Sequence, residues 1–150
     1  MAKYTIGLDF GTNSARALLV NVASGQELAT SVCNYAHGQE GIILDSQYPH
    51  LARQHPKDYL DSLTVCIRQV MAEAGDKVSP GDIIGIGVDT TGSTPLPLDR
   101  NGQPLAFANE FKDEPAAMAW LWKDHTSHAA AEEITDLASR VRPSYLAKCG

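Results

Sequence analysis

The sequence predicts an α/β domain with a mixed sheet that opens with three antiparallel strands and has helices packed on it. Residues 4–10 alternate between apolar and small or polar side chains, which is the two-residue period of a strand. Two further apolar stretches, 15–20 and 27–35, follow after short turns and before any helical pattern. Residues 56–74 then show the helical period, and an apolar strand at 83–88 comes next.

The turn between the first two strands carries polar chemistry. Asp9 closes the first strand, small and polar residues follow, and Arg16 returns on the second strand. A carboxylate can face Mg²⁺ through its waters, while turn amides and hydroxyls hold phosphate oxygens. An ordinary hairpin with a polar tip fits the same pattern. The residues predicted to bind phosphate or ATP are Asp9, Gly11, Thr12, Asn13, Ser14 and Arg16.

The helix predicted at 56–74 has matching end signals. Pro56 suits the first turn, Asp58 favours the N-terminus, and Gly75 ends the helix. Its predicted apolar face consists of Leu60, Leu63, Ile67, Val70, Met71 and Ala74. The preceding stretch, 38–54, is rich in Gly, Pro and polar residues and is predicted to be a loop.

A small polar loop at 90–94 follows the strand at 83–88, directly after Asp89. Ligands of open α/β sheets collect at the carboxyl ends of strands, so this loop is either a binding loop or a plain connection. The Asn101-Gly102 pair then indicates a hairpin between 94–98 and 104–107.

Residues 114–140 are predicted to form two pieces. The first, 115–121, is a short helix or an extended segment, and 122–125 is an irregular junction. A helix capped by Thr126 or Ser127 then runs to about Arg140, and Pro143 stops it. The residues predicted on the inner face of that helix are Ala130, Ile134, Leu137 and Val141.

The junction places an indole, an ammonium group, a carboxylate and an imidazole in a row. Sugar and polyol sites set an aromatic plane against C–H groups and charged groups against hydroxyls. A core tryptophan beside a solvated charge cluster is the alternative, and the pattern alone favours it. The residues of interest are Trp122, Lys123, Asp124 and His125.

Composition narrows the class of protein. The 150 residues carry a formal net charge of −6 without a basic patch, which argues against nucleic acid and anionic membranes as partners. No apolar run approaches the roughly 18 residues of a membrane span. The N-terminus enters a strand directly, so we expect no signal peptide. Three widely spaced cysteines predict reduced thiols and a cytoplasmic protein.

Five segments, in this order, resemble the N-terminal part of the FGGY family of carbohydrate kinases. They are GLDFGTNSARALLV at 7–20, QHPKDY at 54–59, GVDTTGST at 87–94, LD with GQPL within 98–105, and WKDH at 122–125. The first segment alone is shared by the wider actin-like ATPase superfamily. The resemblance covers nearly the whole chain. It implies a fold of two ribonuclease-H-like domains with the active site in the cleft between them.

The resemblance also implies an activity. Three of the segments are similar to those of family members that transfer the γ-phosphate of ATP to the 5-hydroxyl of ribulose, giving ribulose 5-phosphate in L-arabinose catabolism. ATP and Mg²⁺ are then the implied cofactors, with the ion on Asp9 through water. Gly92 and Ser93 approach the sugar closely, and Trp122 and Asp124 shape its pocket. Lys123 and His125 are weaker candidates.

Family members of this kind are several times longer than this chain. We therefore expect residues 1–150 to be the N-terminal part of the first domain. The general-base aspartate is then expected downstream, with no catalytic residue and no activity in this chain alone. Alternatives are a family kinase for another pentulose or for a polyol such as glycerol, and a non-enzymatic ATPase module of the actin or Hsp70 type. The expected partners are the sugar and ATP, and a homo-oligomer of the parent is left open.

Overall fold

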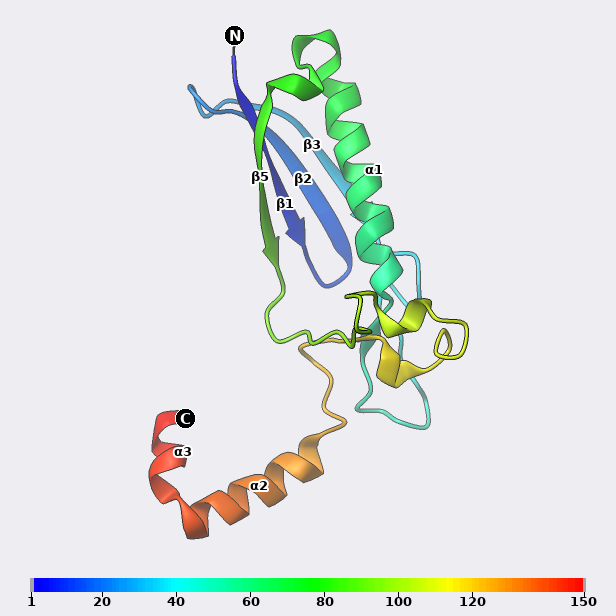
Figure 1. Ribbon diagram of the computed structural model, residues 1–150, viewed down its shortest axis with the longest axis vertical. Helices are drawn as coiled ribbons and strands as arrows, with labels where there is room; N and C mark the ends of the chain where they lie inside the picture. The colour runs from blue at the N-terminus through cyan, green and yellow to red at the C-terminus, as the bar shows by residue number, and fades with distance from the viewer. Residues whose placement is uncertain (1, 150) are drawn as a thin grey trace.

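The computed structural model describes residues 2–149 and shows one four-stranded sheet with a long helix on one face (Figure 1). The strands follow the order β3-β2-β1-β5 across the sheet. Their bounds are Tyr4–Phe10 for β1, Ser14–Asn21 for β2, Glu27–Asn34 for β3 and Ile83–Thr90 for β5.

The sheet is mixed, as the sequence predicts. β1 pairs antiparallel with β2, and β2 pairs antiparallel with β3, while β5 lies parallel to β1 on its other side. Asp9 is directly opposite Arg16 of β2 and directly beside Asp89 of β5. Because partners in register point to the same face of a sheet, these three side chains share one face.

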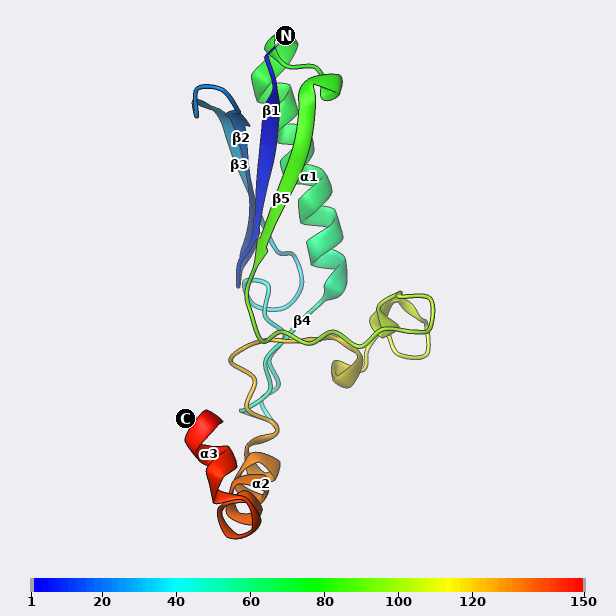
Figure 2. The ribbon, with the colours of Figure 1, turned by 60° about the vertical axis from the view of Figure 1, so that its left-hand side comes forward.

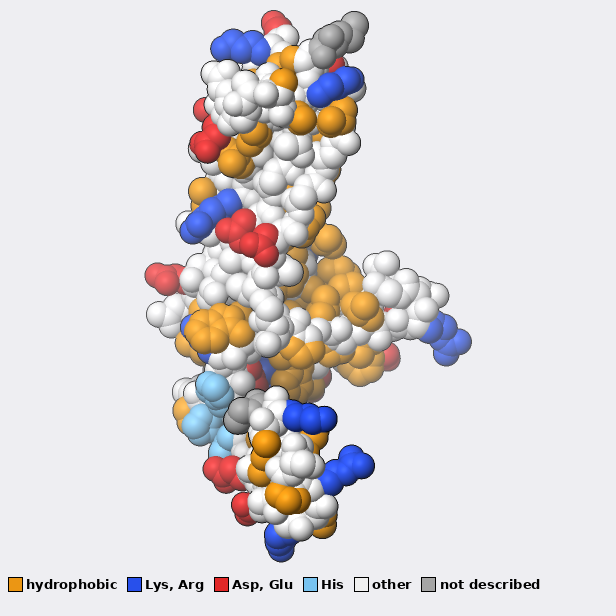
Figure 3. All heavy atoms as spheres, turned by 90° about the vertical axis from the view of Figure 1, so that its left-hand side faces the viewer, with side chains coloured by type: hydrophobic (Ala, Val, Ile, Leu, Met, Phe, Trp, Pro, Cys, Tyr) orange, Lys and Arg blue, Asp and Glu red, His pale blue; other side chains and the backbone are white. Residues whose placement is uncertain are grey.

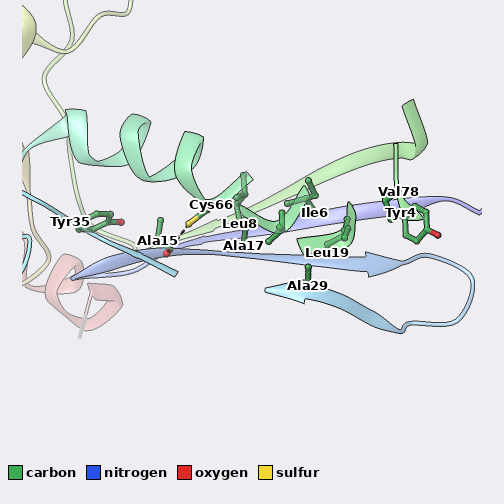
Figure 4. Close-up of a cluster of buried hydrophobic side chains, with 12 residues drawn as sticks. Tyr4, Ile6, Leu8, Ala15, Ala17, Leu19, Ala29, Tyr35, Cys66 and Val78 are labelled. Atoms are coloured by element: carbon green, nitrogen blue, oxygen red, sulfur yellow. Dashed lines mark hydrogen bonds between the residues drawn. The ribbon is translucent and has the colours of Figure 1, made fainter. Parts of the chain in front are cut away.

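The helix α1, Pro56–Ala74, has the predicted bounds, with Pro56 in its first turn. The His55 side chain caps it, since its Nδ1 accepts a hydrogen bond from the Lys57 N–H at 3.2 Å. Gly75 ends it at φ 57°, in the left-handed region where glycine carries no steric penalty. The helix covers β2 and β3, and Figure 4 shows the side chains buried between these layers.

The predicted apolar face of α1 is confirmed for Leu63, Ile67, Val70, Met71 and Ala74, which are buried or pack against the core, but it is wrong for Leu60. A row of residues spaced by four lies against the sheet, and the large Leu60 is 53% exposed. Small side chains on the helix meet small side chains on β2 and β3, so the backbones approach closely: the Ser31 hydroxyl donates to the Cys66 carbonyl at 3.0 Å. The buried row is Asp58, Ser62, Cys66, Val70 and Ala74.

Short elements fill the region beyond the sheet. The predicted loop 38–54 ends in β4, Arg53–Gln54, which pairs antiparallel with β6, Ala119–Trp120. The hairpin predicted around Asn101 is reduced to a turn with one bridge, between Leu98 and Pro104, because prolines on both sides lack the N–H groups that a ladder needs. The 3₁₀ turns are Gly75–Lys77, Pro80–Asp82, Leu105–Phe107 and Pro115–Ala117.

The last two helices, α2 at His128–Val141 and α3 at Pro143–Cys149, form an arm that extends away from the sheet (Figures 1 and 2). The predicted inner face of α2 is wrong for this structure, because no described residue of α2 is buried and Ile134 is 62% exposed. Figure 3 shows hydrophobic side chains lying open on this arm. The bounds of the helix were predicted nearly in full, but the predicted packing of its apolar face was wrong.

No helix within residues 2–149 combines the length and the apolar character needed to cross a membrane. Cys33 and Cys66 are free thiols, and the Cys149 side chain lies outside the described part of the structure.

Candidate functional site

Two of the predicted loops meet where β1 and β5 end. The backbone N–H of Thr91, which begins the polar loop after β5, donates to the Phe10 carbonyl at 3.1 Å. The turn at 11–14 follows Phe10 directly. The parallel pairing of β1 with β5 therefore brings together two loops that are about 80 residues apart in the chain.

The junction after β6 joins them. The Trp120 N–H donates to the Pro95 carbonyl at 2.9 Å, which ties this segment to the loop after β5. The Trp122 indole N–H donates to the Thr12 hydroxyl at 3.2 Å, which ties it to the turn. The indole is 55% exposed, so its face is open to a ligand. These bonds bring the turn, the chain just after the polar loop and the segment that leads into Trp122 together at one end of the sheet.

The face of the sheet beside the turn carries carboxylates and is open to solvent. A groove of about 610 Å³ lies over the sheet face opposite α1, and Asp9, Arg16 and Asp89 line it. The Arg16 guanidinium lies 3.9 Å from the Asp9 carboxylate, and both side chains are half-exposed or more. A guanidinium that is not buried in an ion pair stays available to a second anion, such as a phosphate.

The turn uses some of its own donors. The Gly11 N–H donates to the Ser14 carbonyl at 2.9 Å, and the Asn13 side-chain amide donates to the Glu40 carbonyl at 2.7 Å. Within residues 2–149, the backbone N–H groups of Thr12 and Asn13 have no such partner. The free donors of the turn are therefore these two amides and the hydroxyls of Thr12 and Ser14.

The hydrogen bond from Trp122 directs the Thr12 hydroxyl. A hydroxyl that accepts from an indole N–H keeps its own proton for another acceptor. If phosphate binds at the turn as predicted, one of its oxygens can be that acceptor, and the indole and the phosphate then share one hydroxyl.

The loop after β5 holds an unusual backbone. Ser93 has a φ of 56°, in the left-handed region that non-glycine residues rarely occupy. Gly92 has open space where a Cβ would lie, so nothing in the described chain requires a glycine there. A strained residue next to a glycine that the fold does not need is typical of a binding loop.

Asp124 is fully engaged inside the protein, with a side chain only 4% exposed. One carboxylate oxygen pairs with the Arg53 guanidinium and accepts from the Ala52 N–H at 2.7 Å, and the other accepts from the N–H and hydroxyl of Thr126. Burial opposes its ionisation, but the hydrogen bonds from Arg53, Thr126 and Ala52 outweigh burial and lower the pKa of the carboxyl. Four donors fill the acceptor positions of a carboxylate.

Arg53 is the other half of this cluster and was not predicted. Its guanidinium lies 3.6 Å from the centre of the Trp120 ring, and its Nε–H donates to the Pro115 carbonyl at 3.1 Å. It thus binds β4 to both ends of the segment that leads into Trp122. An arginine in a loop pattern carries no sequence signal for such burial.

Among the described residues, the two weaker candidates form no hydrogen bond with the turn. Lys123 is half-buried, and the backbone N–H of His125 donates to the His50 carbonyl at 2.9 Å while its side chain stays exposed. Their roles toward a sugar stay predictions.

The residues present fit a hydrated magnesium ion. Mg²⁺ is held by one or two carboxylates, with water and substrate phosphates as the remaining ligands. Asp9 and Asp89 offer two adjacent carboxylates on the groove side of the sheet. In the described part of the chain, no group of three or more His, Cys, Asp or Glu side chains is placed to hold a metal.

The sequence pattern of the FGGY family of carbohydrate kinases, N-terminal domain, matches residues 4–142. This chain belongs to that family. The fold and the family pattern agree on the class of protein.

Ribulokinases are among the curated proteins that this chain resembles. The ribulokinase of Vibrio parahaemolyticus is 48% identical over 139 residues, which cover 91% of this chain and 24% of that protein. The ribulokinase of Halalkalibacterium halodurans is 41% identical, over 99% of this chain and 27% of that protein. The chain thus spans about a quarter of the length of the curated relatives it matches.

Solved structures of sugar kinases share the fold. A gluconate kinase from Lactobacillus acidophilus superposes with a TM-score of 0.67 at 18% identity, over 92% of this chain and 23% of that one. A xylulose kinase from the same organism superposes with a TM-score of 0.66, also at 18% identity, over 91% of this chain and 23% of that one. The predicted ribonuclease-H-like class is confirmed at the level of the fold.

Proposed function

We propose that this chain is the N-terminal part of the first domain of a two-domain kinase that transfers the γ-phosphate of ATP to the 5-hydroxyl of ribulose. The similar proteins named ribulokinase support this substrate over another pentulose or a polyol. The contact between Trp122 and Thr12 carries the proposal, because it joins an exposed aromatic face to a phosphate turn. A cytoplasmic setting follows from ATP as the co-substrate.

On the phosphate side, each group has a separate task. Asp9 holds hydrated Mg²⁺, with Asp89 beside it, and the ion neutralises phosphate charge when bound. The free amides of the turn and its hydroxyls donate to phosphate oxygens. Arg16 adds a fixed positive charge for the transferred group. Positioning and charge neutralisation account for most of the catalysis in phosphoryl transfer.

On the sugar side, Trp122 offers its face to the C–H groups of ribulose, and Gly92 and Ser93 line the approach. The missing Cβ of Gly92 leaves space that the sugar fills. The general-base aspartate comes from the part of the kinase beyond this chain.

A direct sugar contact by Asp124 stays a prediction. Its four acceptor positions are already used, so we propose that it acts through position, by holding Arg53 and the segment that carries Trp122. A positioning role predicts a loss of stability together with a loss of sugar affinity.

Steady-state kinetics of the full-length kinase, with ATP and ribulose varied separately, test the assignment. Asp9→Ala should lower kcat by about a hundredfold or more and leave KM for ribulose within a few-fold, because its contacts are made to the metal and phosphates. Gly92→Ala should raise KM for ribulose about tenfold and leave KM for ATP unchanged.

Thermal unfolding supplies the control. Gly92→Ala should keep or slightly raise Tm, because the added methyl meets nothing and the unfolded chain loses freedom. A Gly92→Ala enzyme with normal ribulose KM, or an Asp9→Ala enzyme with near-normal turnover, would contradict the corresponding half of the site. If the wild-type enzyme turns over glycerol or another pentulose faster than ribulose, the assignment of ribulose as the substrate is wrong.

A further inference from the structure

Gln54 is the most buried polar side chain near the turn at 11–14, with 0% exposure. Its Nε2 donates to the Thr12 carbonyl at 2.7 Å, and the Tyr59 hydroxyl donates to its Oε1 at 2.7 Å. We propose that Gln54, held by Tyr59, locks the peptide between Thr12 and Asn13 so that the Asn13 N–H faces the phosphates. The inference rests on the proposed function of the turn.

The orientation of the amide follows from chemistry. The Thr12 carbonyl can only accept a hydrogen bond, so the atom of Gln54 that faces it must be the NH₂ group. The carbonyl oxygen of Gln54 then faces Tyr59, whose hydroxyl must donate. Burial, with a smaller contribution from the Asp58 carboxylate, raises the pKa of Tyr59 to about 12, so this hydroxyl keeps its proton at all working pH values.

The geometry of the peptide unit carries the effect to the ligand side. The peptide between Thr12 and Asn13 is trans, as are all peptides in the described residues. In a trans peptide the C=O and the following N–H point in opposite directions. A carbonyl held inward by Gln54 therefore points the Asn13 N–H outward, and that N–H is one of the two free amides of the turn.

Gln54 is itself well anchored. It lies opposite Ala119 in the pairing of β4 with β6, and α1 begins two residues later. The Tyr59 ring stacks edge-on against Phe10, with centroids 6.0 Å apart. A peptide flip in the turn would leave the buried Gln54 amide without its acceptor, so the flipped state is disfavoured. The donor is preorganised before phosphate arrives.

Three variants of the full-length kinase test this. Gln54→Met removes the donor at similar size, and Tyr59→Phe removes the hydroxyl that holds the amide. Tyr35→Phe is the matched control: Tyr35 lies in the same ring cluster, 5.7 Å from Tyr59, and its buried hydroxyl has no partner among the described residues. We expect Gln54→Met to lower kcat/KM for ATP about tenfold and Tyr59→Phe about threefold, with KM for ribulose unchanged. Tyr35→Phe should match wild type.

The variant Gln54→Glu adds a pH signature that a purely structural role would not give. A buried carboxyl has a raised pKa, and only its protonated form can donate to the Thr12 carbonyl. Relative to wild type, its kcat/KM for ATP should therefore recover about tenfold between about pH 8.5 and pH 6. A ratio that stays flat over this range would overturn the proposal.

Amide hydrogen exchange separates this inference from the proposed function. The protected amide of the turn is that of Gly11, which donates to the Ser14 carbonyl, and in peptides that cover residues 11–14 it should exchange about tenfold faster in Gln54→Met and in Tyr59→Phe than in Tyr35→Phe, whether or not the enzyme phosphorylates ribulose. If Gln54→Met fails to fold, the comparison of amide exchange between Tyr59→Phe and Tyr35→Phe still tests the proposal. Equal exchange in that pair would refute the lock, and an inactive wild type with the expected exchange difference would refute the kinase assignment alone.

Discussion

The helices α1 and α2 look alike in the sequence and differ in the structure. Both show a helical apolar period and a plausible start signal. α1 buries Cys66, Val70 and Ala74 against the sheet, whereas α2 leaves Ile134, Leu137 and Val141 exposed. Periodicity therefore predicts a helix and its apolar face, but it does not predict whether a partner surface is present in the same chain.

The ends of the two helices differ in the same way. His55 caps α1 through its side chain, whereas Ser127 at the start of α2 makes no capping bond. The Arg53–Asp124 cluster joins the strand before α1 to the last segment before the arm. Substitutions at matched positions can sharpen or break this contrast between the packed region and the arm.

The largest effect is expected at the cluster. Asp124→Asn leaves the buried Arg53 charge unpaired and should lower the free energy of unfolding by about 3–5 kcal/mol. Asp113→Asn makes the same change at an exposed position and should change it by less than about 0.5 kcal/mol. Urea unfolding at pH 7 measures both, and equal midpoints would show that the cluster is not buried in solution.

The same pair gives a pH dependence. The pKa of Asp124 is lowered from its ordinary value of 3.8, so its ionised form stabilises the fold above about pH 4, and this stabilisation is lost as the pH falls further. The gap between wild type and Asp124→Asn should therefore narrow below about pH 4. A gap of constant size in unfolding experiments from pH 7 to pH 3 would contradict the lowered pKa.

The next effect compares the faces of the two helices. Leu63→Ala in α1 should cost about 2 kcal/mol, the low end for a leucine packed against the core, because Leu63 is half-buried. Leu137→Ala in α2 should cost less than about 0.5 kcal/mol, since that side chain is 52% exposed. If Leu137→Ala costs as much as Leu63→Ala, the arm is packed in solution.

The smallest effect concerns the caps. His55→Ala should cost about 1 kcal/mol, whereas Ser127→Ala should cost little, because only His55 makes the capping bond. Burial, and then the neighbouring His37, lowers the pKa of His55 from 6.5, so its neutral form stabilises the fold and this stabilisation is lost as the pH falls below about 6.5. His55→Asn should keep the cap and flatten that pH slope.

The sequence predicts the elements better than their contacts. The strands and the bounds of α1 follow from local patterns, because alternation, proline and glycine act within a few residues. Val70 and Ala74 of the buried row were predicted, but Ser62 and Cys66 could not be, since such small residues are buried only because the side chains of the sheet beneath them are also small. The prolines around Asn101 weakened a hairpin that the Asn-Gly signal alone favoured.

In the candidate site, too, the sequence predicts residues of the right type better than it predicts their long-range contacts. The turn and the junction stand out by residue type, so Asp9 and Trp122 could be selected from the chain alone. The link from Trp122 to Thr12 spans 110 residues, and no local pattern reports it. Gln54 lies inside a segment that resembles the family, but a glutamine two residues before a proline gives no sign that its amide bonds to a turn 42 residues away.

The parallel pairing of β5 with β1 also sets an order of folding. The three-stranded meander β1–β2–β3 closes short loops, whereas β5 must find β1 across about 80 residues and around α1, which is entropically costly. We expect pulse-labelled amides of β2 to gain protection before those of β5 during refolding. The turn at 11–14 then forms early within its hairpin, and Asp89 reaches Asp9 only in the final step, so a chain arrested before residue 83 would hold a formed turn without the second carboxylate.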